Sequence, residues 1–126
     1  MAKRKLAALS PAETQILRIV WELAKATVQQ VVDNLPADRK ITYATVQTLL
    51  RRLEAKGYIK HNNDGRAHVF GPAVKKEAVI KRTVTDFLDR LFGGDPAPLM
   101  HFLAEHDRID AKDIRRLKKL VNKGRS

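Results

Sequence analysis

The apolar residues in the first part of the chain recur at helical spacing in two neighbouring segments. The first begins with a capping box over Ser10–Glu13, in which the serine caps the helix, the proline takes the first helical position and the glutamate reaches back. Its apolar stripe consists of Ile16, Leu17, Val20, Trp21, Leu23 and Ala24. A second helix is predicted from about Val28 to Leu35, between the capping residue Thr27 and the helix-ending Pro36.

A third helix, with two unlike faces, is predicted between the capping residue Thr42 and Gly57. At about 100° per residue, one side is aliphatic and consists of Val46, Leu49, Leu50 and Leu53. The remaining positions carry Ala44, Thr48 and Arg51 on the far side, Thr45 and Arg52 on one shoulder, and Gln47 on the other. This helix is therefore expected to be held by one face and to present small hydroxyl groups and arginines on the other.

The apolar period then changes to the alternation that is typical of strands. Residues 58–61 and 66–70 are predicted to pair as a hairpin, with residues 62–65 as the turn. Its Asp-Gly dipeptide is a strong hairpin signal, because both residues tolerate positive φ. Gly71 and Pro72 are expected to end the second strand.

Helical spacing returns in the last part of the chain. A long helix is predicted from about Val74 to Phe92, followed by a breaker at Gly93–Pro96, a short helix, and a last helix capped by Asp110. The apolar stripes of these helices are Ile80, Val84, Phe87, Leu88, Leu91 and Phe92; Leu99, Met100, Phe102 and Leu103; and Ile114, Leu117, Leu120 and Val121.

These C-terminal helices carry many large apolar side chains for their length. With about 19, 7 and 14 residues, they make too thin a core for independent stability. Packing against an identical set would bury the stripes and give two-fold symmetry. The alternative is that they pack back onto the N-terminal part of the same chain.

Composition and charge narrow the class of protein. The 126 residues fit one medium domain or two small ones, and they exclude a large enzyme with separate cofactor and substrate lobes. Lysine and arginine number 25 against 14 acidic residues, a formal charge of +11 that predicts a polyanionic partner, nucleic acid before membrane. The absence of cysteine excludes disulfides, thiolate metal sites and cysteine nucleophiles.

No membrane insertion is expected from the hydropathy pattern. No segment approaches eighteen uncharged apolar residues. The N-terminal apolar stretch, residues 6–9, is too short for a signal peptide and is followed by Pro11 and Glu13. The expected location is the cytoplasm.

Three helices followed by a hairpin is the order of a winged helix–turn–helix. We therefore predict a mainly α protein with a small β-hairpin wing: a winged helix–turn–helix DNA-binding domain over residues 6–74 and a helical dimerisation domain over residues 75–123. The third helix would enter the major groove, and the wing would supply a basic rim of Lys60, Arg66 and His68. The alternatives are that Arg51 and Arg52 form a solvated face and that His68 is a partly buried strand residue.

Catalytic, metal and cofactor sites are not expected. The four histidines, His61, His68, His101 and His106, lack a common ligand spacing. Asp107, Asp110 and Asp113 resemble a metal cluster, but helix capping and first-turn charge explain the last two. The protein is therefore expected to be a binding protein and not an enzyme.

Three segments of the chain together resemble the penicillinase-repressor (BlaI/MecI/CopY) family. They are AETQILRIVWELAKATVQQVVDNLP at 12–36, ITYATVQTLLRRLEAKGYI at 41–59 and DGRAHVFGP at 64–72. The resemblance covers residues 6–74 and continues weakly through the C-terminal helices, where family members carry a helical dimerisation region. It implies a homodimeric transcriptional repressor that binds a palindromic operator in double-stranded DNA.

The resemblance also assigns site residues. The recognition-helix contacts of the family fall on Thr42, Tyr43, Ala44, Thr45, Gln47, Thr48, Arg51 and Arg52, and the wing contacts on Lys60, Arg66 and His68. Some relatives have lysine in place of Ala44 and arginine in place of Gln47. The dimerisation contacts are expected on Ile80, Val84, Phe87, Leu88, Leu91, Phe92, Leu99, Phe102, Leu103, Ile114, Leu117, Leu120 and Val121.

The branches of this family differ in their inducing signal. The copper-responsive branch ends in paired cysteines, which this chain lacks. The resemblance therefore favours the β-lactam-responsive branch, linked to antibiotic resistance, in which a membrane metalloprotease sensor induces cleavage of the repressor. The scissile bond of the family falls between His101 and Phe102 here, with the histidine in place of the commoner asparagine. The remaining alternative is a basic RNA- or ribosome-binding protein without sequence preference.

Overall fold

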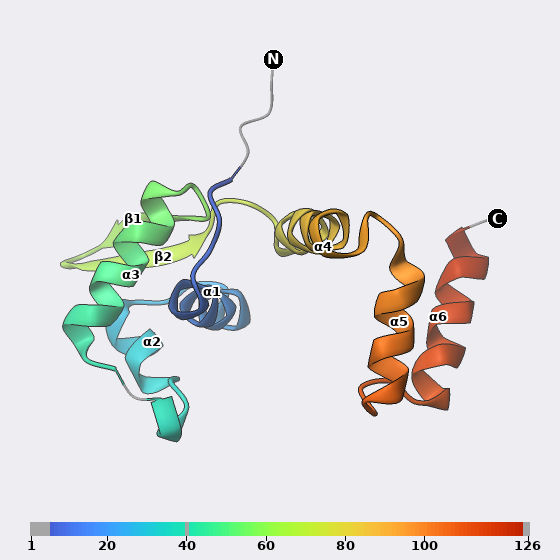
Figure 1. The fold of residues 1–126 in the computed structure, drawn as a ribbon. Coiled ribbons are helices and arrows are strands. Elements are labelled where there is room, and N and C mark those ends of the chain that lie inside the picture. Colours follow the sequence, from blue (N-terminus) through green and yellow to red (C-terminus); the bar gives the residue numbers. More distant parts are fainter. Residues whose placement is uncertain (1–5, 40, 125–126) are drawn as a thin grey trace, which may run out of the picture. The chain divides into compact units, whose positions relative to one another are not determined.

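Six α-helices, one 3₁₀ helix and two strands make up the part of the chain that the computed structural model describes, residues 6–39 and 41–124. Residues 1–5, the beginning of the stretch that is not expected to be a signal peptide, lie outside the described residues. The elements, in chain order (Figure 1), are α1 (Pro11–Leu23), α2 (Val28–Asp33), η1 (Ala37–Arg39), α3 (Tyr43–Ala55), β1 (Ile59–Asp64), β2 (Ala67–Pro72), α4 (Lys76–Phe92), α5 (Pro96–Glu105) and α6 (Ala111–Gly124). The predicted mainly α fold with one small hairpin is confirmed.

The chain divides into two compact units, one reaching to Val79 and one starting at Ile80. We call them the N-terminal unit and the C-terminal unit. The division falls inside α4. The first turn of this helix belongs to the N-terminal unit, and the rest belongs to the C-terminal unit.

The predicted helix caps of the N-terminal unit are present. In the capping box of α1, the Ser10 backbone NH donates to Glu13 Oε1 (2.8 Å) and the Glu13 NH donates to Ser10 Oγ (3.1 Å). Thr27 caps α2 through the NH of Gln30 (3.2 Å), and the Gln30 side chain completes a second capping box that was not predicted. These bonds occupy backbone donors that a helix N-terminus otherwise leaves free.

One apolar core holds the N-terminal unit together. Its buried side chains come from α1, α2, α3, the hairpin, the segments that connect them and the first turn of α4, and they are Ile16, Leu17, Ile19, Val20, Ala26, Val28, Val31, Leu35, Val46, Leu49, Leu50, Leu53, Tyr58, Ile59, Phe70 and Val79. The predicted stripe of α1 needs correction: Trp21 and Leu23 are only half-buried, Ala24 is exposed beyond the helix end, and Ile19 is buried. Neighbouring elements cover more of α1 than one stripe.

A buried ion pair fixes the end of α3 to the start of α1. Glu13 is only 2% exposed, and its Oε1 accepts a hydrogen bond from Lys56 Nζ at 2.6 Å. The same ammonium donates to the carbonyl of Ala8 at 2.9 Å. Gly57 follows with a φ of +90°, which glycine adopts without strain, and so ends the helix as predicted. The orientation of α3 is therefore set from both its aliphatic face and its C-terminal end.

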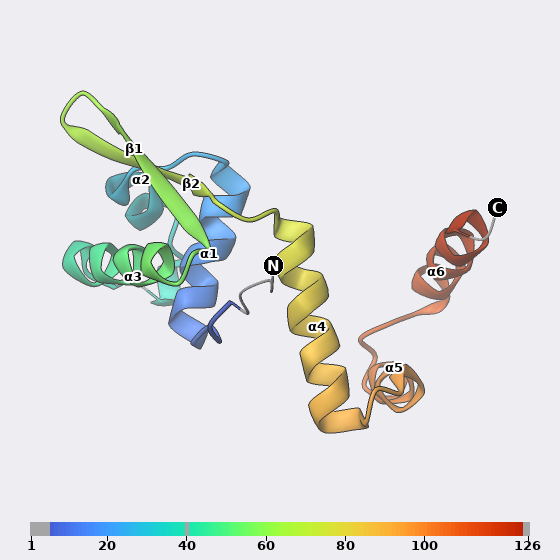
Figure 2. The ribbon, with the colours of Figure 1, turned by 90° about the horizontal axis from the view of Figure 1, so that it is seen from above.

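The hairpin differs from the prediction in where it turns. The strands pair from Ile59 with Pro72 to Asp64 with Ala67, so only Gly65 and Arg66 form the turn. Residues 62–64 belong to β1, and Gly71 and Pro72 belong to β2. Gly65 has a φ of +63°, as the first position of a two-residue type II′ turn requires. The strands are therefore longer than predicted, and Figure 2 shows the tip of the hairpin projecting beyond α2 and α3.

The loop between α1 and α2 adds a short bridge to the sheet. Ala26 and Phe70 exchange two backbone hydrogen bonds, at 2.9 and 2.8 Å. A Cβ atom at Gly71 would lie 3.2 Å from the Ala24 carbonyl oxygen, so glycine is what allows the two segments to approach. This bridge anchors the base of the wing to the helical core.

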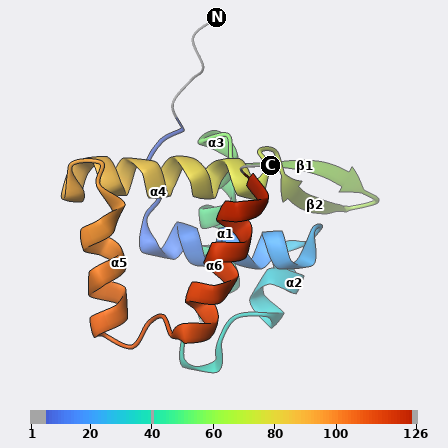
Figure 3. The same cartoon turned by 90° about the vertical axis from the view of Figure 1, so that its right-hand side faces the viewer.

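The C-terminal unit is organised differently. Helices α4, α5 and α6 follow one another as separate rods (Figure 3), and among the described residues no two of them pack closely together. Asp110 caps α6 as predicted, through the NH of Asp113 at 3.0 Å. From Ile80 to Asn122, the part of this unit whose side chains are described, every apolar side chain is half-buried or exposed. This unit has apolar stripes but no enclosed core of its own.

Candidate nucleic-acid interface

The outward face of α3 is the first part of the candidate site. Thr42 caps the helix, accepting from the Thr45 NH at 3.2 Å, and the two threonine hydroxyls lie 2.9 Å apart. The Thr48 hydroxyl donates to the carbonyl of Ala44 at 3.1 Å and keeps acceptor capacity on its oxygen. The capping bonds therefore engage the hydroxyls of Thr42 and Thr45, while the oxygen and methyl group of Thr48 stay available.

The arginines of α3, Arg51 and Arg52, are exposed. No carboxylate of a described residue pairs with Arg51 or Arg52. The buried face of the helix, Val46, Leu49, Leu50 and Leu53, matches the predicted aliphatic side. The polar face is therefore held rigidly from behind, and its cations are free to meet an anion.

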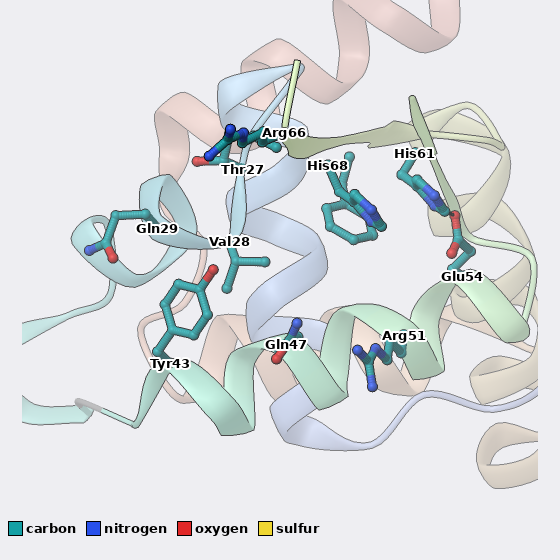
Figure 4. Close-up of a pocket in the computed structure, with 12 residues that line it drawn as sticks. Thr27, Val28, Gln29, Tyr43, Gln47, Arg51, Glu54, His61, Arg66 and His68 are labelled. Atoms are coloured by element: carbon teal, nitrogen blue, oxygen red, sulfur yellow. Dashed lines mark hydrogen bonds and ion pairs between the residues drawn. The ribbon is translucent and has the colours of Figure 1, made fainter. Parts of the chain in front are cut away.

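A groove opens between α3, the N-terminal end of α2 and the hairpin (Figure 4). Its volume is about 460 Å³, and it is lined by Thr27, Val28, Gln29, Tyr43, Gln47, Arg51, Glu54, His61, Arg66, Ala67, His68 and Phe70. Five of the predicted DNA-contacting residues line it: Tyr43, Gln47, Arg51, Arg66 and His68. The structure therefore brings recognition-helix and wing residues together on opposite sides of one groove.

The other six predicted contacts lie outside this groove. Thr42, Ala44, Thr45, Thr48 and Arg52 are exposed on the rest of α3. Lys60 alternates with Ile59 and His61 along β1, so it lies on the opposite face of the hairpin. Arg66, expected in the returning strand, is instead the second residue of the turn at the tip of the wing.

Two residues that line the groove, Glu54 and His61, were not among the predicted contacts. Glu54 Oε2 lies 2.5 Å from Nδ1 of His61, and the His61 ring stacks on that of His68 with centroids 4.5 Å apart. Both could have been found from spacing: Glu54 shares the shoulder of Gln47 on the helical wheel, and strand alternation puts His61 on the face of Ile59. Together the three side chains link the last turns of α3 to both strands of the wing.

Behind α3, the carboxyl group of Glu13 has a clear pKa shift. Hydrogen bonding from Lys56, helped by the Ser10 backbone NH, lowers the pKa of Glu13 below the ordinary value of a glutamate. The carboxylate is therefore charged at neutral pH and keeps the lysine in place at the end of α3. This ion pair supports the site without belonging to its surface.

Neither a cluster of metal-ligating side chains nor a membrane-spanning helix occurs among the described residues. No three histidine, aspartate or glutamate side chains in residues 6–39 and 41–124 gather in a way that could hold a metal ion. No described helix is both long enough and apolar enough to cross a membrane.

The predicted dimerisation residues lie on surfaces of the C-terminal unit. Ile80, Val84, Phe87 and Leu91 are exposed on α4, and Phe102, Ile114, Leu117, Leu120 and Val121 are exposed on α5 and α6. Leu88, Phe92, Leu99 and Leu103 are half-buried. The bond between His101 and Phe102 lies in the middle of α5, and the Phe102 carbonyl accepts from the His106 NH at 3.1 Å.

Comparison with known proteins gives concordant results. The family model described as penicillinase repressor matches residues 9–123. A penicillinase repressor from Bacillus licheniformis is 25% identical over 118 residues, which cover 94% of this chain and 92% of the relative. The solution structure of the DNA-binding domain of the repressor BlaI is 27% identical, with a TM-score of 0.52, over 59% of this chain and 90% of that one. Monomeric Bacillus licheniformis BlaI, solved in complex with the blaP half-operator, is also 27% identical, with a TM-score of 0.50, over 58% of this chain and 89% of that one.

Proposed function

This chain belongs to the penicillinase repressor family, and we propose that it represses transcription by binding a palindromic operator as a homodimer. The family consists of DNA-binding repressors and not of enzymes. The observation that carries the proposal is the exposed polar face of α3 beside the wing, in a unit that is similar to a repressor solved on half of its operator. The winged helix thus provides the operator-binding surface.

Base recognition is assigned to the exposed face of α3. Arginine can donate two hydrogen bonds to a guanine edge, and the methyl group of threonine can contact that of thymine. Arg51 forms no ion pair with a described residue, and Thr48 presents its methyl group and an acceptor oxygen, so these two are the main candidates for reading bases. Tyr43, Ala44, Gln47 and Arg52 extend the same surface at the groove and on the far side of the helix.

Phosphate contact is assigned to the wing and the capping threonines. Arg66 at the tip of the hairpin is exposed, and His68 lines the groove opposite α3. Phosphate contacts orient a protein on duplex DNA but carry no sequence information. Lys60, on the other face of the hairpin, can reach a phosphate only on the outer side of the wing.

Dimerisation is supported by the apolar surface of the C-terminal unit. Leu91, for example, is 66% exposed, and its neighbours on the same stripe are at most half-buried. Such a surface is stabilised when a second copy covers it, and the resulting two-fold axis matches a palindromic site. The alternative of packing back onto the N-terminal unit predicts a monomer, which sedimentation distinguishes from a dimer.

Induction is proposed to proceed by cleavage between His101 and Phe102, under the control of a membrane metalloprotease sensor. The Phe102 side chain is 51% exposed, but its backbone is hydrogen-bonded within α5. Proteases act on extended backbone, so α5 has to unwind locally before this bond is cut. A zinc endoprotease that cuts before large apolar residues should therefore cleave here faster in a monomeric variant than in the dimer.

The experiment that tests the proposed function is selection of DNA from a random duplex library by the full chain, followed by affinity measurements. We expect enrichment of a two-fold symmetric sequence that is bound about 10³-fold or more tightly than random duplex. A repressor acting in the cytoplasm should also prefer this duplex over RNA of the same sequence. Equal affinity for the selected duplex, random duplex and RNA would overturn the proposal in favour of a basic RNA- or ribosome-binding protein.

A further inference from the structure

One side of α6 carries a basic stripe that operator reading and dimerisation do not use. We define the stripe as Lys112, Arg115 and Lys119, which fall within about 60° of one another on the helical wheel. All three side chains are exposed. None of them makes a hydrogen bond or ion pair with another described residue. The stripe is therefore an unneutralised cationic surface.

Positive charge in the C-terminal unit is concentrated on this helix. Residues 111–122 carry five basic side chains against one acidic, whereas residues 80–110 carry four basic against six acidic. The one acidic residue of the helix segment, Asp113, is bound to the backbone NH of Asp110 at 3.0 Å as part of the helix cap. Solubility alone does not explain such a separation, because an even distribution of charge would serve it as well.

The stripe lies on the opposite side of α6 from its apolar residues. Ile114, Leu117, Leu120 and Val121 occupy the other half of the wheel, and all are exposed. Whatever covers these aliphatic side chains therefore leaves the basic stripe in contact with solvent. In the proposed dimer each protomer contributes one such stripe.

We propose that the basic stripe of α6 binds the phosphate backbone of duplex DNA, as a sequence-independent contact separate from the winged helix. This inference rests on the proposed function. From Lys112 to Lys119 the helix rises by about 10 Å, and over that length of the duplex axis one strand carries about three phosphates, at one per about 3.4 Å of axis. The stripe thus presents cations over the length of a short run of phosphates.

DNA is favoured over a membrane surface by what each would require of α6. An interfacial helix buries its apolar face, usually with aromatic residues, in the lipid. The apolar face of α6 has only four aliphatic side chains, which the proposed dimer already uses. DNA requires only the basic face. Because the C-terminal unit continues from the operator-binding unit through α4, DNA bound by one unit is present near the other at high effective concentration.

The test uses two full-length triple variants with equal changes in charge. Lys112→Gln/Arg115→Gln/Lys119→Gln removes the stripe, and Lys81→Gln/Arg90→Gln/Arg108→Gln removes three exposed cations elsewhere in the same unit. Affinity for the selected operator, embedded in longer flanking duplex, and for random duplex is measured over a range of salt concentrations. Sedimentation of each variant establishes that the oligomeric state is unchanged.

The stripe variant should show a salt dependence that is shallower by about 0.9 for each lost phosphate contact, or about 2–3 units for each protomer of the proposed dimer. Its ratio of operator to random affinity should stay unchanged, because phosphates carry no sequence information. A stripe variant whose salt slope equals that of the control variant would overturn the proposal. So would unchanged DNA binding together with a specific loss of binding to anionic phospholipid vesicles. Failure of the proposed function is separate, since it appears as the absence of operator preference in the wild-type protein.

Discussion

The two units of this protein place their apolar side chains differently. In the N-terminal unit, Ile16, Leu50 and Leu53 are each 0% exposed, inside a core shared by three helices and a hairpin. In the C-terminal unit, Leu91 and Leu120 are each 66% exposed on helices that do not pack closely on one another. The first unit completes its core within one chain, whereas the apolar stripes of the second stay exposed unless another surface packs against them.

The difference shows that amphipathic periodicity does not by itself build a core. A helix stripe is stabilised only where other elements cover it, and hydrophobic burial scales with the area removed from water. The N-terminal unit has the hairpin and the Ala26–Phe70 bridge to close its core. The C-terminal unit has no sheet among its described residues. We therefore propose that a second copy of the chain covers its apolar stripes.

The largest effect is expected when charge is placed on the apolar stripe of α4. Leu88→Glu together with Leu91→Glu should give a monomer whose N-terminal unit stays folded, as seen by sedimentation and circular dichroism. Operator affinity should fall by about 10² to 10⁴-fold, because the second half-site loses its effective concentration. Arg90→Glu, which changes the net charge equally at an exposed position next to the stripe, is the control and should remain dimeric. A double variant that sediments as an unchanged dimer would refute the assignment of this stripe.

A matched pair of leucine substitutions compares the two units directly. Leu50→Ala opens a cavity at a position that is 0% exposed, and should lower the free energy of unfolding of the N-terminal unit by about 2–5 kcal/mol. Leu91→Ala, at a position that is 66% exposed, should leave that unfolding transition unchanged and weaken only self-association. Urea denaturation at several protein concentrations separates the two effects. Equal loss of stability from both substitutions would mean that the C-terminal helices pack onto the N-terminal core.

Base recognition should belong to the N-terminal unit alone. Thr48→Ala and Arg51→Ala should each reduce discrimination between operator and random DNA by about 1–3 kcal/mol if the side chain contacts a base edge. In the monomeric Leu88→Glu/Leu91→Glu background, each substitution should cause the same loss of discrimination per half-site. Arg66→Ala, at the tip of the wing, is the comparison: it should weaken both DNAs about equally and make the salt slope shallower by about one unit. If Arg66→Ala changes base preference while the α3 variants do not, the wrong element has been assigned to the major groove.

The smallest expected effect concerns the ion pair behind α3. The pKa of Glu13 is lowered in the folded protein, so its carboxylate stabilises the fold at pH values above the ordinary pKa of glutamate. This stabilisation is lost as the pH falls through the lowered pKa. Glu13→Gln should lower the stability of the N-terminal unit by about 1 kcal/mol at neutral pH, because the amide oxygen still accepts from Lys56 and Ser10 but the hydrogen bonds lose the added strength of a charged acceptor. Wild type and variant should converge in acid, which urea titrations at several pH values measure. A constant difference down to acidic pH would show that the Glu13 charge is not what stabilises α3.

Local patterns in the sequence were sufficient for most of the fold. The capping signals at Ser10, Thr27, Thr42 and Asp110 each mark the start of an observed helix, because capping depends on residues three positions apart. The buried face of α3 followed from the helical period alone. The family was also recognisable, since its motifs lie in continuous segments that the family model covers over residues 9–123.

Other features of the fold depend on contacts between residues far apart in the chain. The ion pair of Glu13 with Lys56, the backbone bridge of Ala26 with Phe70 and the groove between α3 and the wing have no local signal, because their members are brought together by packing. The hairpin turn moved to Gly65 and Arg66 because cross-strand pairing continued further than strand propensity indicated. The same limit applies to the stripes of α4 and α6: periodicity identifies an apolar face, but only the surrounding elements determine whether it is covered.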